Sequence, residues 1–600
     1  MKLSDYVFSQ LRQWGARQVF LITGGGAMHL NDSIGTSGLR YVCTHHEQAA
    51  AMAAEGYARI TGTPAILNVT TGPGGINALN GVFGAWTDSI PMLVLSGQVK
   101  RETCMRSQGI TGLRQLGDQE VDIVAMAEKI TKCAVMVDNP LTIRYHLERA
   151  WHLARSGRPG PCWLDIPVDV QAANIEPDQL ERYDPAKSDL KASTGVVDLV
   201  AECHEVLQKL ATAKRPVILA GTGVRAAHAV DEFDCLIHRL GIPVTTAWTH
   251  DLIASDDTLY CGRQGTIGNR AGNFTVQNAD VLLVLGSRLS IRQTSYNWQS
   301  FACNSFRIQV DIDEAELHKP MVKPHMAIVT NLKTFLNEAI RQCAAGKYEP
   351  DVRAHERWLG WCRERVRRYP AVQERQRKPG PPLNPYYFVE QLSERLGDDD
   401  AVICGNATAC IVPFQTLKLR KQQRLISNSG SASMGYDLPA AVGAAFARPG
   451  KRVICVAGDG SIQMNIQELQ TIVHHQLPIK IFVLNNSGYL SMRMTQSGFF
   501  GRLIGESAAS GTSLPDIVKV ACAYGIKSVR IDRESQFDQI DRVLQADGPA
   551  LIDVVLDPAQ EFEPRSKARQ LPDGRIASPN LEDMYPFLSE SELSDNAFKE

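Results

Sequence analysis

A glycine-rich turn near residue 459 combines the residue types needed to bind a phosphate and a divalent cation. The hydrophobic run RVICVA (452–457) leads directly into Gly458, Asp459, Gly460 and Ser461, and a helical apolar pattern follows. Glycine lets the backbone come close to a ligand, and the start of a helix offers free N–H groups to a phosphate. The alternative interpretation is a turn with an incidental aspartate.

The next hydrophobic run, IKIFVL, ends in Asn485 and Asn486. In a strand–helix–strand unit, the carboxyl ends of both parallel strands lie at the same edge of the sheet, where open α/β sheets bind ligands. The carboxylate of Asp459, the amide oxygen of Asn486 and the main-chain carbonyl of Gly488 form a ligand set suited to Mg²⁺, completed by two diphosphate oxygens and water. We therefore predict a magnesium–diphosphate site at this edge.

Three blocks of the chain alternate short apolar runs with longer helical patterns, which is typical of parallel sheets covered by helices. The predicted strands cover residues 18–23, 65–71, 92–98 and 163–170, then 216–221, 281–286 and 307–313, and finally 401–405, 452–460, 479–486 and 550–557. Polar stretches at 172–194 and 348–383 separate the blocks. The predicted fold class is α/β, with domains at 1–180, 195–345 and 380–560 and a C-terminal tail at 561–600.

The bulk composition is that of an ordinary globular enzyme. Of 600 residues, 44% are hydrophobic and 21% are charged, and 63 basic against 65 acidic residues give a net charge of −2. This balance argues against nucleic acid or a membrane surface as a partner. The start of the chain lacks a signal-peptide core, and no run of about 18 apolar residues occurs, so we expect a cytoplasmic protein. The 14 cysteines include no Cys-x-x-Cys pair, and we expect reduced, structural thiols.

Several longer stretches, together with the GDGS…NN pattern, resemble the acetohydroxyacid synthase (acetolactate synthase)-like branch of the thiamine-diphosphate enzymes. They are THHEQAAAMAAEGYARITG (44–62), TTGPGGINALNGVFGAWTDSIPMLVLSGQ (70–98), GRPGPCWLDIP (157–167), SMGYDLPAAVGAAFA (433–447) and GDGSIQMNIQELQTI (458–472). The resemblance implies three flavodoxin-like or Rossmann-like domains: a pyrimidine-binding domain, a middle domain and a diphosphate-binding domain. It also implies a homodimer or homotetramer in which the first domain of one subunit faces the third domain of another.

The resemblance assigns roles to individual residues. Glu47 matches the glutamate that holds N1′ of the aminopyrimidine, which favours the tautomer that takes the thiazolium C2 proton. Without that match, Glu47 would be read as a helix-capping charge. Met434 matches the residue that keeps thiamine bent, although a methionine in an apolar turn is more often core. Gln119 matches a glutamine near the reacting centre, where an isolated glutamine would be read as solvated. Asn406 and Thr408 stand where the family contacts the diphosphate, with the usual Gln-His-Gln replaced.

The middle block carries a possible dinucleotide fingerprint. Gly221, Gly223 and Arg225 belong to GTGVRA, which fits G-x-G-x-x-A after a predicted strand but is weak evidence alone. Asp311 or Asp313, at the end of RIQVDID, is a candidate to meet a ribose or an adenine. These segments resemble the flavin-carrying members of the family, in which FAD is largely structural, so FAD is predicted. The alternative is an empty middle domain.

The sequence departs from true acetohydroxyacid synthases at pocket positions. Thr495 stands where they have a tryptophan that favours 2-ketobutyrate, and Val168 replaces a lysine. Arg292 keeps the arginine of their FDDR motif, as a candidate carboxylate clamp, but both aspartates are lost. His29 is a candidate proton-transfer residue or a structural histidine. These departures favour a side branch, near acyl transferases to keto-sugars and the cyclohexane-1,2-dione hydrolases.

We therefore predict a thiamine-diphosphate-dependent carboligase that decarboxylates a 2-keto acid such as pyruvate and transfers the acyl unit to a second carbonyl. The alternatives are hydrolytic cleavage of a 1,2-dione, simple decarboxylation of a 2-keto acid, a redox flavoenzyme and a binding protein without catalysis. The expected cofactors are thiamine diphosphate, Mg²⁺ and FAD. The tail, residues 562–588, is either a lid over the active site that excludes water or a surface extension.

Overall fold

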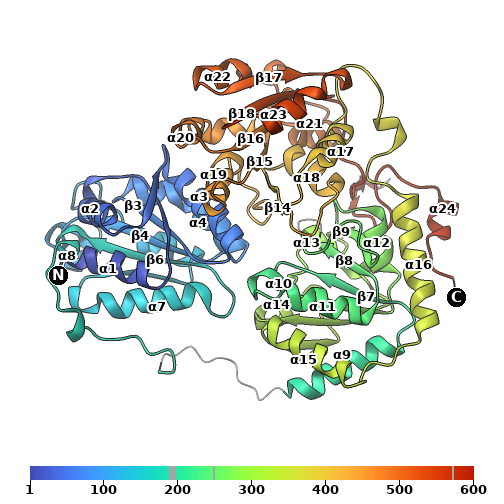
Figure 1. The fold of residues 1–600 in the computed structure, drawn as a ribbon, viewed down its shortest axis with the longest axis horizontal. Helices are drawn as coiled ribbons and strands as arrows, with labels where there is room; N and C mark the ends of the chain where they lie inside the picture. The colour runs from blue at the N-terminus through green and yellow to red at the C-terminus, as the bar shows by residue number, and fades with distance from the viewer. Residues whose placement is uncertain (188–197, 248–250, 571–572, 600) are drawn as a thin grey trace.

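The structure is a computed structural model, and it describes residues 1–187, 198–247, 251–570 and 573–599. Part of the predicted linker at 172–194, the first three residues of the predicted middle domain and the last residue of the predicted tail lie outside these ranges. Figure 1 shows three α/β units, with the first in blue, the middle one in green to yellow and the third in orange to red. Each unit contains a six-stranded sheet, which confirms the predicted fold class.

The first sheet has the order β2-β1-β3-β4-β6-β5, and all its strand pairs are parallel. Its strands are β1 (Gln18–Leu21), β2 (Arg40–Cys43), β3 (Ala65–Val69), β4 (Met92–Gln98), β5 (Cys133–Met136) and β6 (Pro161–Pro167). Its helices are α1 (Leu3–Gln13), α2 (Met28–Thr36), α3 (Glu47–Thr61), α4 (Pro73–Thr87), α5 (Met105–Gln108), α6 (Ile123–Ala127), α7 (Ile143–Arg155) and α8 (Val168–Gln171).

The prediction of one strand over residues 163–170 is wrong at its end. Strand β6 stops at Pro167, which has no amide hydrogen to continue the ladder, and helix α8 follows at once. The Gln171 side chain donates to the carbonyl oxygens of Ile166 and Gly26, each at 2.7 Å, and thereby ties this turn back to the strand.

The middle sheet has the order β12-β11-β10-β7-β8-β9. Read from β9, this is the 3-2-1-4-5-6 order of dinucleotide-binding folds. Its strands are β7 (Pro216–Ala220), β8 (Val244–Ala247), β9 (Tyr260–Gln264), β10 (Val281–Leu285), β11 (Phe306–Asp311) and β12 (Met326–Val329). Its helices are α9 (Leu199–Thr212), α10 (Gly223–Ala226), α11 (Val230–Leu240), α12 (Arg270–Gln277), α13 (Ile291–Thr294), α14 (Glu314–His318), α15 (Leu332–Ala344) and α16 (Val352–Arg368).

The third sheet, β14-β13-β15-β16-β18-β17, repeats the strand order of the first. Its strands are β13 (Ala401–Cys404), β14 (Arg424–Ile426), β15 (Val453–Gly458), β16 (Ile479–Asn485), β17 (Lys527–Ile531) and β18 (Ala550–Val555). Its helices are α17 (Pro385–Arg395), α18 (Thr408–Thr416), α19 (Asp437–Ala447), α20 (Glu468–His474), α21 (Leu490–Phe499), α22 (Ile517–Ala523) and α23 (Asp538–Gln545).

Helices α3 and α19 join the first and third domains in one continuous hydrophobic core. A Cβ atom at Gly56 would lie 2.4 Å from the carbonyl oxygen of Ala440, and one at Gly443 would lie 1.9 Å from that of Ala53. Glycine at both crossing points therefore lets the helix backbones touch. The middle of α3 is consequently held by the third domain of its own chain.

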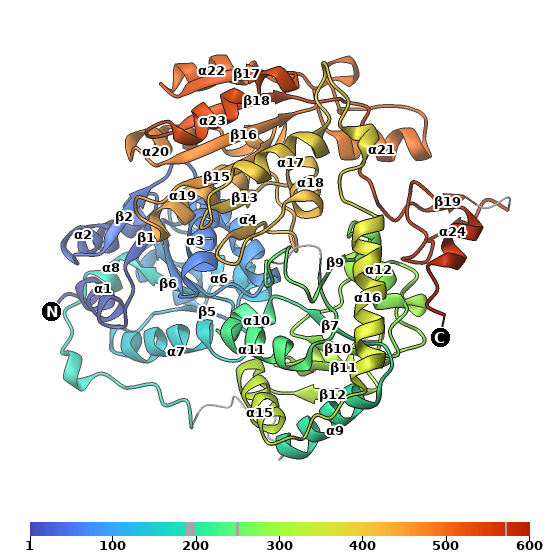
Figure 2. The same ribbon diagram turned by 45° about the vertical axis from the view of Figure 1, so that its right-hand side comes forward.

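The C-terminal tail lies along the middle domain, beside α12 and α16 (Figure 2). Phe598 packs edge-on against Trp358 and Trp361, and the Asn273 side chain donates to the carbonyl oxygen of Leu581. Nearer its start, Ser566 donates its N–H to the carbonyl oxygen of Thr266. The tail also contains β19 (Arg569–Gln570), β20 (Ile576–Ala577) and α24 (Glu590–Asp595).

All 14 cysteines are free thiols, and none of the helices described has the length and apolar character to cross a membrane.

Candidate active site

Glu47 lies at the carboxyl edge of the first sheet as the first residue of α3. It is buried, with 9% of its surface exposed. Asn77 of α4 donates to Glu47 Oε2 at 3.0 Å, whereas Oε1 accepts no hydrogen bond from any described residue. A Cβ atom at Gly74 would lie 3.4 Å from that Oε1. One carboxylate oxygen is thus fixed and the other is available beside a glycine turn.

Glycine turns pack closely around Glu47. A Cβ atom at Gly24 would lie 2.5 Å from Thr70 Cβ, and one at Gly26 would lie 1.8 Å from Thr71 Oγ1. The turns after β1 and β3 therefore touch, which only glycine permits. His29 follows the first of these turns, in α2, and is half-buried.

Gln119 belongs to a loop that reaches the same edge. Its φ of 62° lies in the left-handed region, and a Cβ atom at Gly72 would lie 2.0 Å from its carbonyl oxygen. The sequence did not single out Glu120, which shapes this loop: it is buried, and it accepts from the N–H groups of Met105, Leu116 and Gly117. In the sequence, Glu120 could have been noticed because it directly follows Gln119, the glutamine that matches the family.

Asp459 lies at the carboxyl edge of the third sheet, after β15. Its Oδ1 accepts from the N–H of Gly460 and its Oδ2 from that of Gly488, both at 2.9 Å. Burial raises the pKa of this carboxyl to about 6, and the two N–H groups oppose that rise. Gly488 has a φ of 139°, and a Cβ atom there would lie 2.0 Å from the carbonyl oxygen of Glu506. The two ends of the predicted strand–helix–strand unit therefore meet.

Asn486 presents a buried oxygen at this edge. Its Nδ2 donates to Thr408 Oγ1 at 3.0 Å, while its Oδ1 has no hydrogen-bond partner among the described residues. A buried amide oxygen without a donor is suited to a cation. Asn406 donates to the carbonyl oxygen of Ala432 at 3.0 Å. No group of three His, Cys, Asp or Glu suited to a metal occurs in the described part of the chain, and the predicted set contains a single carboxylate.

The Met434 segment is attached to the glycine-rich turn. Ser461 Oγ accepts from the N–H of Gly435 at 2.9 Å and donates to Asp437 Oδ2 at 3.1 Å. Asp437 is fully buried, and burial raises its pKa to about 6. Met434 is half-buried. The bridge made by Ser461 therefore fixes the segment relative to Asp459.

Within one chain, the hydrogen bonds and ion pairs among the described residues do not link Glu47 to Asp459. Instead, Glu468 of α20 accepts from the N–H of His45 at 3.0 Å, so the third domain holds the turn that precedes Glu47. Glu468 was not among the predicted residues, and because the partners are 423 positions apart in the chain, no local pattern could have revealed the contact.

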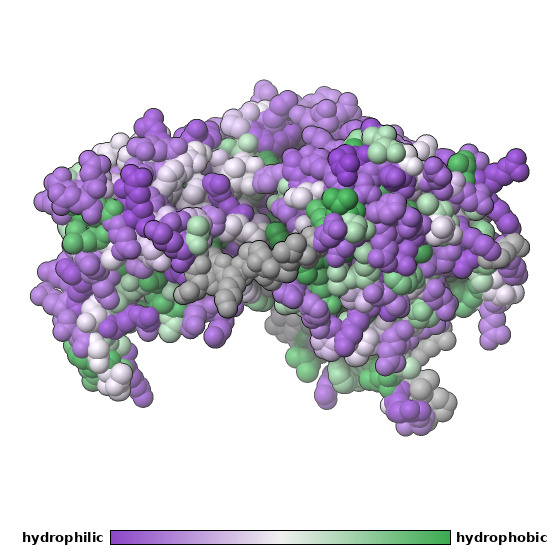
Figure 3. All heavy atoms as spheres, turned by 90° about the horizontal axis from the view of Figure 1, so that it is seen from below, coloured by the Kyte–Doolittle hydropathy of each residue, from purple (hydrophilic) through white to green (hydrophobic). Residues whose placement is uncertain are grey.

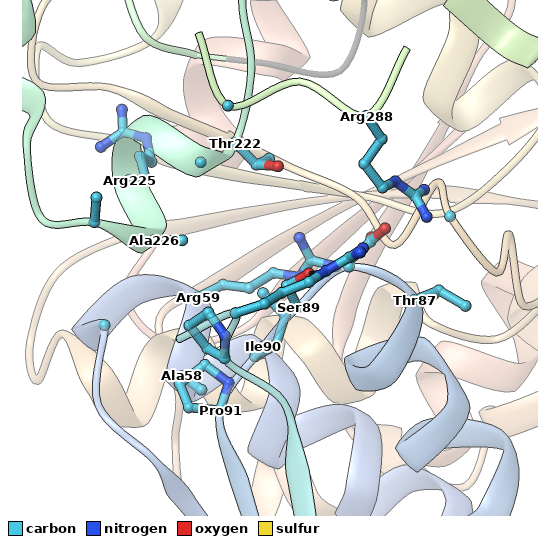
Figure 4. Close-up of a pocket in the computed structure, with 18 of the residues that line it drawn as sticks. Ala58, Arg59, Thr87, Ser89, Ile90, Pro91, Thr222, Arg225, Ala226 and Arg288 are labelled. Carbon is cyan, nitrogen blue, oxygen red and sulfur yellow. Dashed lines mark hydrogen bonds and ion pairs between the residues drawn. The ribbon is translucent and has the colours of Figure 1, made fainter. Parts of the chain in front are cut away.

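A cavity of about 1130 Å³ lies between the three domains. Figure 4 shows Ala58, Arg59, Ile90 and Pro91 on one side of it, with Thr222 and Arg225 across from them. Figure 3 shows that the face seen from below is largely hydrophilic. Of the predicted residues, Gly223, Arg225, Asp311 and Arg292 line the cavity.

Gly221 is not part of that lining. A Cβ atom there would lie 2.4 Å from the carbonyl oxygen of Gly286, so this glycine allows two strand ends to pack. Asp313 is also engaged elsewhere, because its carboxylate pairs with Arg158 at 2.7 Å. Asp311 is buried, and this burial raises its pKa.

Buried ion pairs tie the domains together around the cavity. Asp251 pairs with Arg225 at 2.8 Å and with Arg424 of the third domain at 2.7 Å. These two arginines hold the pKa of Asp251 well below its usual range against the effect of burial, which is the largest influence and acts in the opposite direction. No local sequence pattern predicts this network, because Asp251 and Arg424 are 173 residues apart in the chain.

Two predicted substrate residues lie apart from each other. Arg292 lines the inter-domain cavity. Thr495 is exposed on α21, and its hydroxyl donates to the carbonyl oxygen of Ser491 within the same helix, at 2.9 Å. The described contacts bring neither side chain to Glu47 or Asp459.

Comparison with known families identifies the class of protein that this fold and these sheet edges define. Residues 1–126 match the N-terminal TPP binding domain of thiamine pyrophosphate enzymes, residues 203–339 match their central domain, and residues 405–554 match their C-terminal TPP binding domain. The chain is therefore a thiamine pyrophosphate enzyme.

Curated relatives narrow the class. The chain is 32% identical to the acetolactate synthase isozyme 2 large subunit of Escherichia coli, over 94% of this chain and 97% of the relative. It is 31% identical to a probable acetolactate synthase large subunit of Methanocaldococcus jannaschii, over 93% of each. It is 29% identical to the acetolactate synthase large subunit of Lactococcus lactis, over 99% and 98%. The chain belongs to the acetolactate synthase large-subunit family, which confirms the resemblance inferred from its motifs.

Proposed function

We propose that the enzyme joins an acyl unit from a 2-keto acid such as pyruvate to a second carbonyl compound. The bond between C1 and C2 of the keto acid breaks, CO₂ leaves, C2 bonds to the acceptor carbon, and one proton is taken up. Thiamine diphosphate, when bound, supplies the electron sink for this chemistry. Membership of the acetolactate synthase family supports a thiamine-dependent carboligase.

The observation that carries the proposal is the arrangement of Glu47 and Asp459 at the carboxyl edges of the first and third sheets. Glu47 keeps Oε1 available while Asn77 holds Oε2, which suits a carboxylate that binds N1′ of an aminopyrimidine and controls one proton there. Asp459, Asn486 and the carbonyl of Gly488 would hold Mg²⁺. The fit of Mg²⁺ to these residues rests on Oδ1 of Asn486, which has no hydrogen-bond partner among the described residues.

Other residues of the two edges bind or orient. Gly458, Gly460 and Ser461 surround the Asp459 turn, and Thr408 orients Asn486. Asn406 and Thr408 would contact the diphosphate, and Met434 would support the bent thiamine from the segment that Ser461 anchors. Gln119 and His29 would face the reacting carbons from the first domain. The tail would exclude water over this site; its observed contacts are with the middle domain and, at its start, with α17 and α18 of the third domain.

FAD is proposed as the occupant of the inter-domain cavity. The 3-2-1-4-5-6 strand order and the cavity volume support a dinucleotide. Gly223 and Arg225 lie at the start of α10, where a diphosphate would sit, and Asp311 at the end of β11 would meet a ribose. Arg292 would then contact FAD or the substrate carboxylate.

A homodimer or homotetramer is proposed because the surface beside Glu47 is apolar and uncovered. Ile76 and Phe83, seven residues apart on α4, are 41% and 40% exposed. Ile76 is the neighbour of Asn77, which holds Glu47. An apolar helix face next to a half-formed site suits a second subunit that brings its Asp459 edge.

The test is CO₂ release from pyruvate by the purified enzyme with thiamine diphosphate and Mg²⁺, with products resolved by mass spectrometry. We expect CO₂ together with acetolactate or another acetyl adduct. CO₂ with free acetaldehyde alone would indicate a simple decarboxylase. If neither pyruvate nor its longer homologues release CO₂ but a cyclic 1,2-dione is opened, the enzyme is a hydrolase, an outcome that the altered pocket positions Thr495 and Val168 keep open.

A further inference from the structure

Arg59 of α3 connects the wall of the inter-domain cavity with the segment that carries Met434. Its Nη2 donates to Glu55 Oε1 and to Asp88 Oδ2, each at 2.6 Å, and its Nε donates to Glu55 Oε1 at 2.9 Å. Arg59 and Asp88 both line the cavity (Figure 4 labels Arg59). The guanidinium is therefore fixed on the first-domain side while it borders the space proposed for the dinucleotide.

The same first-domain groups lie beside the segment from Gly430 to Tyr436 at both ends. A Cβ atom at Gly430 would lie 2.1 Å from Asp88 Oδ1, so glycine lets the carboxylate approach this backbone. At the other end, Tyr436 is fully buried, and burial raises the pKa of its hydroxyl; Glu55 adds to that rise and Arg59 opposes it. Met434 lies between these two points.

The middle of the segment faces the cavity and the first domain together. Ser431 and Ala432 line the cavity. Ser433 Oγ donates to Asn80 Oδ1 of α4 at 2.9 Å. The position of Met434 thus depends on α3, α4 and the cavity wall rather than on the third domain alone.

Hydrogen bonds around Arg59 are incomplete in the described part of the chain. Glu55 Oε2, the Tyr436 hydroxyl and Asn428 Oδ1 are buried and have no hydrogen-bond partner there. Unpartnered buried groups leave a network free to adopt more than one arrangement, and contact with a ligand can select one of them.

We infer that Arg59 is a positioning residue that couples the two cofactor sites. A dinucleotide that fills the cavity and engages Arg59 fixes the Gly430–Tyr436 segment, and with it Met434, in the arrangement that receives thiamine diphosphate. Because binding couplings are reciprocal, thiamine diphosphate tightens dinucleotide binding by the same factor. This inference rests on the proposed function.

The test is a set of four calorimetric titrations on the full-length enzyme, which together form a thermodynamic cycle. Thiamine diphosphate with Mg²⁺ is titrated with and without saturating FAD, and FAD is titrated with and without thiamine diphosphate. We expect the wild-type enzyme to show a coupling factor of about tenfold, equal in both directions. Arg59→Lys keeps the charge but loses the forked geometry, so its factor should fall close to one.

Two further variants separate coupling from general damage. Tyr436→Phe removes only the hydroxyl and should reduce the coupling factor with little change in melting temperature. Asp311→Asn alters the same cavity from the middle domain, at the end of β11, and should weaken FAD binding while preserving the factor. If Arg59→Lys and Tyr436→Phe both keep the wild-type factor, or the wild-type factor is one, the inference is wrong. Failure of the wild-type enzyme to bind thiamine diphosphate would instead refute the proposed function, and failure to bind FAD would remove this inference alone.

Discussion

The first and third domains share one strand order but carry different chemistry at the carboxyl edges of their sheets. The first edge presents Glu47, with one oxygen held by Asn77 and the other available. The third edge presents Asp459, held by two backbone N–H groups, beside the bare amide oxygen of Asn486. In the proposed function, the same fold thus supplies a proton-handling carboxylate in one copy and a cation-binding carboxylate in the other. The groups that contact each carboxylate, rather than the topology, set its role.

The largest effect on cofactor binding should come from the cation-binding edge. Asp459→Ala removes the only carboxylate of the predicted Mg²⁺ ligands, and we expect thiamine diphosphate to bind at least about 100-fold more weakly. Calorimetric titration with Mg²⁺ present measures this. Asp516→Ala, which removes a half-buried carboxylate that caps α22 and pairs with Arg530, is the matched control and should bind normally. Undiminished binding by Asp459→Ala would refute the metal assignment.

The proton-handling edge should respond in the opposite way. Glu47→Gln keeps the shape and the contact with Asn77, so thiamine diphosphate should still bind within a few-fold. Turnover should fall by about 10²–10⁴-fold because the acid–base group is lost. Steady-state kinetics measure turnover, and calorimetry measures the binding of thiamine diphosphate. Glu102→Gln, which changes an exposed side chain, is the control. Near wild-type turnover would show that Glu47 does not activate the cofactor.

A smaller, pH-dependent effect should come from the helix that Glu47 begins. Burial raises the pKa of Glu55 from 4.5 to about 7. Between these pH values, Glu55 holds a proton in the folded protein that it releases in the unfolded chain. Its contribution to the free energy of unfolding therefore falls as the pH rises towards 7. Relative to Glu55→Gln, the wild-type enzyme should lose up to about 3 kcal/mol between pH 4.5 and 7.5. Thermal unfolding of both proteins across this range measures the difference, and parallel curves would contradict the assignment.

The smallest effect concerns the acceptor. Thr495→Trp restores the residue type of true acetohydroxyacid synthases and should shift the product ratio from pyruvate and 2-ketobutyrate by about tenfold towards 2-ketobutyrate. Competition assays with both keto acids measure the ratio, with Thr495→Val as the control for loss of the hydroxyl. An unchanged ratio would mean that the exposed position on α21 does not line the acceptor pocket.

The predicted strands and the observed ones differ mainly at the sheet edges. All eleven predicted runs contain a strand, because central parallel strands are buried on both faces and read as continuous apolar runs. The six edge strands, β2, β5, β9, β12, β14 and β17, were missed. Several are short and partly exposed, as β2 and β17 are, so their hydrophobic signal is weak. Inner strand β8 was missed for a different reason: its VTTA sequence looks polar although it is fully buried.

The functional residues divide in a similar way, into those that a local sequence pattern predicts and those that it does not. The GDGS and NN turns are local in sequence, and the structure brings Asp459 and Gly488 into hydrogen-bonding contact as the spacing indicated. The contacts of Glu468 with His45, and of Asp251 with Arg424, join separate domains. Such contacts depend on how complete domains dock, and no periodicity or spacing in one sequence encodes them.

The most direct test of the account is complementation between two inactive variants, because its central claim is that one active site uses the Glu47 edge of one subunit and the Asp459 edge of another. Glu47→Gln and Asp459→Ala subunits are co-expressed with different affinity tags, and the hybrid oligomers are purified and assayed. In a hybrid dimer, one site receives both substitutions and the other receives none. Random pairing should therefore restore about a quarter of wild-type turnover, and purified hybrids about half. Hybrids as inactive as the parent variants would contradict the claim and place both carboxylates in a site within one chain.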